Sequence, residues 1–157
     1  MLAAHCNPVS GQCLTHVPSA YLDQHLEQLD PQRSVIEQLN LLDTPLSEGA
    51  VRSRLAHLQL DAVRVTMPTR LLSGGERLKA ALAVAAWREN PAQLLLLDEP
   101  SNHLDLASVQ ALEQALRGFA GAIIAVSHDA GFINALQPTH TLAWTPDGWC
   151  LHNAHQP

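Results

Sequence analysis

Three short segments with side chains suited to phosphate and metal chemistry follow one another in a fixed order. They are Leu72-Ser73-Gly74-Gly75-Glu76, the apolar run that ends in Asp98-Glu99-Pro100, and Ser127-His128-Asp129. A Ser-Gly-Gly sequence at a helix start offers unpaired backbone N–H groups, a hydroxyl and the positive end of the helix dipole, which suit a phosphate group. An isolated segment of this kind is more often an ordinary helix cap, so its interpretation depends on the two segments that follow it in the sequence.

The two carboxylates at the end of the apolar run predict metal and general-base chemistry. Open parallel sheets bind ligands at the carboxyl ends of their strands. We expect Asp98 to hold magnesium, mainly through water, and Glu99 to act as general base on an attacking water. The alternative is an acidic pair that caps a helix.

Two further polar residues follow strands that we expect in the same sheet. His128 comes after the next strand, so sheet geometry would bring it to the edge where Glu99 lies, within reach of a terminal phosphate. Alone, it would be a helix cap or a solvated residue. Gln24 follows an earlier strand, where its side-chain carbonyl could bind magnesium, although an isolated glutamine there is usually a surface residue.

The second half of the chain alternates helix and strand signals. Ser73 caps a helix that starts at Gly74 and stops before Asn90-Pro91, and Asp105 caps a helix from Leu106 to about Phe119 that ends by Gly121. The apolar runs 93–97 and 122–126 predict central strands covered on both faces. Strand, helix and strand with short connections predict a parallel sheet with a right-handed crossover.

The flanking regions carry weaker signals. We expect a strand ending near residues 21–24, a helix from Ser34 to about Leu42 opened by a capping box, a helix over 47–58 and a connector over 59–70. Segments 139–144 and 149–152, around Pro146-Asp147-Gly148, predict a terminal hairpin. Residues 1–157 are therefore expected to form one α/β domain: a parallel sheet with helices on both faces, a helical lobe at about 31–90, a segment 91–136 from the acidic strand to His128, and a hairpin and tail at 137–157.

Composition limits the class of protein. The 157 residues are 46% hydrophobic and 15% charged, as in an ordinary globular domain, and the net charge of −6 provides no general field for nucleic acid. Cys6, Cys13 and Cys150 lack the spacing of a zinc site, which suits free thiols in a reducing compartment. Because no run has the length of a membrane span or the pattern of a secretion signal, we expect a cytoplasmic protein.

The order of the segments resembles the C-terminal part of an ATP-binding cassette, most closely of the ABC-F class. Its glutamine loop is matched by 21–25, its signature by 72–76, its Walker B strand by 94–99, its D-loop by 101–105 and its switch histidine by His128. Asn102-His103-Leu104-Asp105 favours ABC-F over transporter subunits. The resemblance implies binding and hydrolysis of ATP with Mg²⁺, and a soluble parent with two cassettes that acts on the ribosome in translation or antibiotic resistance.

The resemblance also implies a role for each matching residue. Glu99 and His128 would be catalytic, and Asp98 and Gln24 would bind the metal. The residues implied to contact nucleotide are Gln24, Ser73, Gly74, Gly75, Glu76 and Asp105. Two cassettes pair head to tail in this family, so the implied partner is a second cassette in the same parent or in a second copy, with the ribosome as a further partner.

One family feature has no match in the sequence. No glycine-rich loop ending in Gly-Lys-Ser/Thr occurs, and Lys79, the single lysine, falls inside an expected helix. Ser101 stands in place of the usual threonine, and Ala130 where an arginine often follows the switch. We therefore expect a gene fragment, a misassigned start or a split cassette that is inactive alone. The rival interpretations are a non-catalytic pseudo-cassette or remnant that binds a partner and, less favoured, a transporter ATPase subunit.

Overall fold

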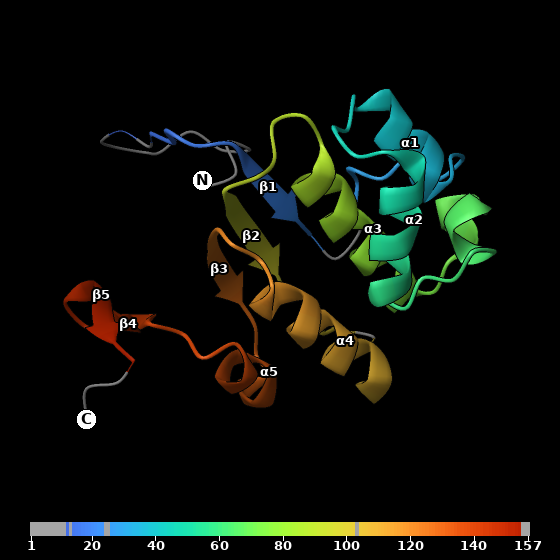
Figure 1. Ribbon diagram of the computed structural model, residues 1–157. Coiled ribbons are helices and arrows are strands. Elements are labelled where there is room, and N and C mark those ends of the chain that lie inside the picture. The colour runs from blue at the N-terminus through green and yellow to red at the C-terminus, as the bar shows by residue number, and fades with distance from the viewer. Residues whose placement is uncertain (1–11, 13, 24–25, 103, 155–157) are drawn as a thin grey trace.

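A three-stranded parallel sheet forms the centre of the molecule. The computed structural model describes residues 12, 14–23, 26–102 and 104–154, and its sheet has the order β1 (Ser19–Leu22), β2 (Leu94–Asp98), β3 (Ala122–Val126). The helices are α1 (Val35–Leu41), α2 (Glu48–His57), α3 (Gly74–Trp87), α4 (Leu106–Arg117) and α5 (Ala130–Ala135), with two 3₁₀ turns, η1 (Arg64–Thr66) and η2 (Thr69–Leu71). A hairpin of β4 (His140–Thr145) and β5 (Gly148–Asn153) follows (Figure 1).

Side-chain caps set the helix starts where the sequence predicts them. Ser34 and Ser73 each form a complete capping box with the glutamate three residues later, and Asp105 caps α4. An N-cap is a contact within one turn, so the residue types alone reveal it.

One face of the sheet forms the core with the helices. The register places Ala20, Leu95 and Ile123 side by side, and likewise Leu22, Leu97 and Ala125. Leu22, Leu95 and Leu97 are at most 2% exposed, and they belong to one apolar cluster with residues of α3, α4 and α5. Figure 1 shows α3 and α4 on the same side of the strands. Each fully buried leucine contributes about 1.5–3 kcal/mol relative to an exposed one.

The other face is open at β3. Ile124 and Val126 alternate with the core residues and are 42% and 59% exposed. The α/β class, the parallel sheet and the terminal hairpin are confirmed. The exposure on this face is local to β3, because Leu96 of β2, which pairs with Ile124, is 5% exposed.

Three local features differ from the expectation. Helix α4 ends at the C-cap Gly118 rather than near Gly121, whose missing Cβ would lie 2.4 Å from the carbonyl oxygen of Gln93, so that glycine permits a close backbone approach. The expected connector 59–70 contains η1 and the start of η2. The six-residue α5 was not predicted, since it is too short for a clear period. Of the residues described, no helix is long and apolar enough to cross a membrane.

Candidate functional site

Glu99 and His128 lie together at the carboxyl edge of the sheet. The Glu99 backbone N–H donates to the Val126 carbonyl at 2.8 Å, which ties the end of β2 to the end of β3. Its carboxylate accepts from the His128 backbone N–H at 3.2 Å and lies 3.3 Å from His128 Nε2. The His128 side chain is 97% exposed and that of Glu99 only 17%. The imidazole is therefore open to a ligand, while the Glu99 carboxylate lies further inside the protein.

The backbone at Glu99 is strained. Its φ is 49°, in the left-handed region that costs a residue with a side chain about 1–3 kcal/mol. The following turn is closed by Asn102, whose N–H donates to the Glu99 carbonyl at 3.1 Å. Strain of this kind persists where surrounding contacts fix the backbone, and it is frequent at functional sites.

Asp98 is held by a residue that sequence reasoning missed. Tyr21 on β1 donates its hydroxyl to Asp98 Oδ2 at 2.8 Å. This hydrogen bond, followed by burial and then by the charges of Asp98 and Asp23, raises the pKa of Tyr21 to about 12. The available signal was the tyrosine three residues before Gln24, on a strand expected in the same sheet. Gln24 itself lies outside the described residues.

The carboxylate at this edge suits a hard cation whose remaining ligands are water and substrate phosphates. Over the described ranges, no three His, Cys, Asp or Glu side chains form a group that could hold a metal. Mg²⁺ is commonly held by one or two carboxylates, with water and substrate phosphates as the remaining ligands. The Asp98 carboxylate, oriented by Tyr21, fits that role.

The signature is a tightly capped helix start. Ser73 Oγ accepts from the Glu76 N–H at 3.3 Å, and Glu76 Oε2 accepts from the Ser73 N–H at 2.7 Å. Glu76 Oε1 also lies 3.3 Å from Arg64 Nε on η1. Because both of its oxygens are engaged, Glu76 would contribute to a nucleotide site by holding Ser73 in place.

The starts of α3 and α4 touch each other. A Cβ at Gly75 would lie 2.4 Å from Ser108 Oγ and 2.5 Å from Ser108 Cβ, so only glycine allows this approach. Asp105 Oδ1 accepts from the Ser108 N–H at 2.7 Å, and the backbone and side-chain hydrogen bonds of Ser108 lower the pKa of Asp105. Two positive helix ends therefore lie side by side, which favours an anion in front of them.

Lys79 lies inside α3, where the charges of Glu76 and Asp105 at the two helix starts act on it. It is 5% exposed, and its Nζ donates to Gln59 Oε1 at 3.5 Å. Burial lowers the pKa of its ammonium group. Its environment is therefore that of a structural residue of α3.

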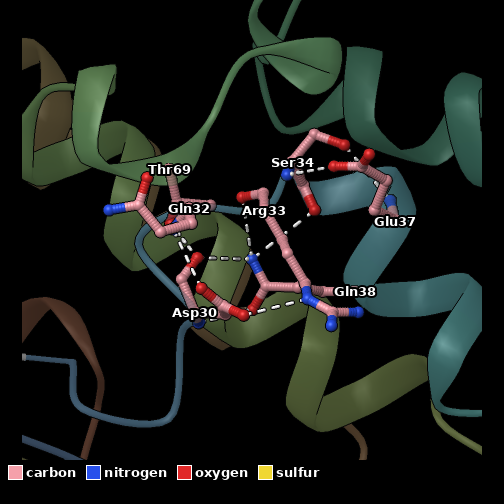
Figure 2. A network of polar contacts seen from close by, with 7 residues as sticks. All are labelled: Asp30, Gln32, Arg33, Ser34, Glu37, Gln38 and Thr69. Atoms are coloured by element: carbon pink, nitrogen blue, oxygen red, sulfur yellow. Dashed lines mark hydrogen bonds and ion pairs between the residues drawn. The ribbon is translucent and has the colours of Figure 1, made fainter.

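A polar network joins the segment after β1 to the segment before the signature. Gln38 is 6% exposed, accepts from the Asp30 N–H at 2.9 Å and donates to the Asp30 and Arg33 carbonyls at 3.2 Å. Thr69, on η2, donates to the Asp30 carbonyl at 2.7 Å (Figure 2). The network fixes the approach of the chain to Ser73, and sequence reasoning found only its capping box.

Comparisons with known proteins identify the family. Residues 18–134 match the family described as "AAA domain, putative AbiEii toxin, Type IV TA system". The chain is 41% identical over 132 residues to "Probable ATP-binding protein YheS" of Escherichia coli K12, and 36% identical over 142 residues to "ATP-binding protein Uup" of Haemophilus influenzae. The chain belongs to this AAA-domain family and to the ABC-F class of ATP-binding cassette proteins.

The matches cover most of this cassette segment but little of its relatives. The alignments with YheS and Uup include 82% and 85% of the chain, and the chain spans 20% and 21% of those proteins. An archaeal ribosome recycling factor, solved in complex with a ribosomal stalk protein, superposes with a TM-score of 0.69 at 26% identity over 90% of the chain and 28% of its own. A dimeric ATP-binding cassette bound to ADP and Pi gives 0.58 at 23% identity over 77% and 55%, which shows the shared fold.

Proposed function

We propose that this chain supplies the hydrolytic edge and the signature of an ABC-F cassette, and that the completed cassette converts ATP and water to ADP and phosphate. The observation that carries the proposal is the pairing of Glu99 with His128 at the carboxyl edge, with Glu99 in a strained conformation.

Each residue at the edge has a distinct role. Glu99 accepts the proton of the attacking water, and His128 contacts the terminal phosphate from its exposed position. Asp98, oriented by Tyr21, and Gln24 would hold Mg²⁺, which would neutralise charge on the phosphates when bound. In the proposed division of the domain, these residues belong to the glutamine loop before the lobe 31–90 and to segment 91–136, with 137–157 outside the site.

The signature serves a second nucleotide. Ser73, Gly74 and Gly75 bind the phosphates of an ATP held mainly by another cassette, with Asp105 and Glu76 shaping the two helix starts. A dimeric arrangement in a protein of the same fold supports a paired cassette as the partner. This partner is either a second cassette of the same parent or another copy.

The phosphates of the chain's own nucleotide need a cradle from another segment. The sequence contains no phosphate loop, and the buried Lys79 contacts Gln59. We therefore propose that ATP binds productively only where a glycine-rich loop with its lysine is joined to this part. The ribosome is the proposed site of action, in the cytoplasm, on the likeness to ABC-F relatives and to a ribosome recycling factor.

A fusion tests this function. The phosphate-loop segment of an ABC-F relative is placed before residue 1 in a two-cassette protein, and phosphate release is measured with and without Glu99→Gln. We expect turnover in the fusion. Glu99→Gln should lower turnover by at least about 100-fold and leave ATP affinity within about threefold, because the general base acts on water while phosphate and metal contacts hold the nucleotide.

The controls separate an enzyme from a binding module. Glu113→Gln, on α4 and away from the carboxyl edge, should leave turnover unchanged. The unfused chain should release no phosphate. An active fusion in which Glu99→Gln keeps its rate would refute the catalytic assignment, and a fusion that binds ATP without hydrolysis would favour the pseudo-cassette.

A further inference from the structure

A cavity lies at the opposite end of the sheet from Glu99. Its volume is about 670 Å³, within the range of small-molecule sites. The lining includes Gln93 just before β2 and Gly121 just before β3, whereas Glu99 and His128 follow those strands. The cavity is bounded by the C-terminal ends of α2, α3 and α4.

The walls of this cavity are mainly apolar. Leu58 and Leu82 contribute aliphatic surface, Trp87 and Phe119 contribute aromatic rings, and several alanines keep the space open. Burial of the apolar part of a ligand there would contribute a favourable free energy of about 25 cal/mol per Å² of apolar surface removed from water.

Arg54 brings a permanent positive charge to the lining, beside the neutral amides of Gln59, Gln93 and Gln114. Among the described residues that line the cavity there is no Asp or Glu, although the whole chain has a net charge of −6. The Arg54 guanidinium carbon lies 5.9 Å from the centroid of the Trp87 ring, which places the charge beside the aromatic wall. Such a lining complements a ligand that is apolar at one end and anionic at the other.

Gln59 adds a fixed neutral donor and acceptor to the same wall. Gln59 follows the C-terminus of α2 and has a φ of 60°. The N–H of the next residue, Leu60, donates to the Leu55 carbonyl at 2.9 Å. This is the pattern of a helix C-cap motif in which glycine is the usual residue. Gln59 Oε1 accepts from Lys79, so a buried ammonium lies behind this wall. This contact from the lysine orients the Gln59 amide.

We propose that this cavity binds an organic carboxylate with an apolar body, with the body between Trp87 and Phe119 and the carboxylate at Arg54. The 14 residues of α3 separate Trp87 from the signature by about 20 Å at the α-helical rise, so this ligand does not overlap a nucleotide there. The proposal stands independently of the ATPase function.

Decanoate is the probe for this site, measured by equilibrium dialysis below its micelle concentration on the full chain. We expect saturable binding that weakens about threefold to fivefold in Arg54→Met, the loss expected for one exposed ion pair. Arg52→Met, two residues earlier on α2 but outside the cavity lining, should bind like the unaltered chain. Decanol should bind less tightly than decanoate, and decylammonium least.

A cavity-filling variant tests the location. Ala111→Trp should lower decanoate affinity by at least about tenfold because the indole occupies the space between α3 and α4. Circular dichroism checks its fold, and the exposed Arg54→Met keeps the test available if Ala111→Trp does not fold. Equal affinity for decanoate and decanol, or binding unaffected by Arg54→Met, would overturn the anionic ligand. Binding unaffected by a folded Ala111→Trp would overturn the site.

Discussion

At the scale of single residues, the carboxyl edge depends on groups supplied by neighbouring strands. Tyr21 comes from β1, two strands away from His128, and its hydroxyl fixes the carboxylate that follows β2. Val126 fixes the backbone of Glu99 from β3. The position of each acidic residue is therefore set by a neighbouring strand as well as by its own.

The hydrogen bond between Tyr21 and Asp98 can be tested by titrating the Tyr21 hydroxyl, because Tyr21 is the single tyrosine of the chain. We expect phenolate absorbance to rise with a pKa of about 12, since ionisation would break the hydrogen bond to Asp98 and place two negative charges together. Asp98→Asn should move the midpoint back toward the ordinary value of about 10. A midpoint near 10 in the folded, unaltered chain would contradict the hydrogen bond.

The same shift has a consequence for stability. Because the folded-state pKa is raised, its stabilising contribution is complete below the unfolded value of about 10 and is lost as pH rises toward about 12. The unfolded chain releases its proton first in that window. Urea unfolding across this alkaline range, followed by circular dichroism, should therefore show a decline that is smaller in Asp98→Asn.

At the scale of elements, the contact between the starts of α3 and α4 depends on one missing methyl group. Gly75→Ala should destabilise the chain by about 1–3 kcal/mol, because its Cβ would meet Ser108 Oγ at 2.4 Å and Cβ at 2.5 Å. Gly74→Ala is the matched control, with its nearest atom at 3.5 Å, and should be neutral or slightly stabilising. Urea denaturation measures both.

A second variant identifies the cause of that loss. Ser108→Gly should restore much of the stability lost in Gly75→Ala, because it removes both clashing side-chain atoms. Ser108→Ala should restore little, since its Cβ remains. Equal stability of the two glycine variants would show that α3 and α4 are not in close contact at Gly75.

Elements governed by local contacts were predictable from the sequence. The starts at Ser34, Ser73 and Asp105 are confirmed because caps act within one turn, and β3 has the predicted bounds. The meeting of Glu99 and His128 was also predictable, since parallel strands end at one edge. The bonds of Tyr21 to Asp98 and of Thr69 to Asp30 join distant segments, and no local pattern specifies them.

At the scale of the whole molecule, apolar side chains gather on two exposed surfaces within the described residues. On the sheet they are Ile124 and Val126, and on the hairpin they are the cross-strand pairs Leu142–Leu151 and Trp144–Trp149, whose members are 58% to 68% exposed. The two tryptophan rings meet edge to face at 5.4 Å. A two-stranded hairpin has little stability of its own, so exposed apolar side chains there favour association with another surface.

We therefore expect the isolated chain to associate as its concentration rises. Ile124→Thr with Val126→Thr should shift sedimentation velocity profiles toward monomer and change unfolding free energy by less than about 1 kcal/mol, because both side chains are already exposed. Ile123→Thr, on the core face of the same strand, should instead cost about 1–3 kcal/mol and leave association in place. A chain that stays monomeric at every concentration, with a cooperative thermal transition, would show that the open face of β3 does not drive self-association.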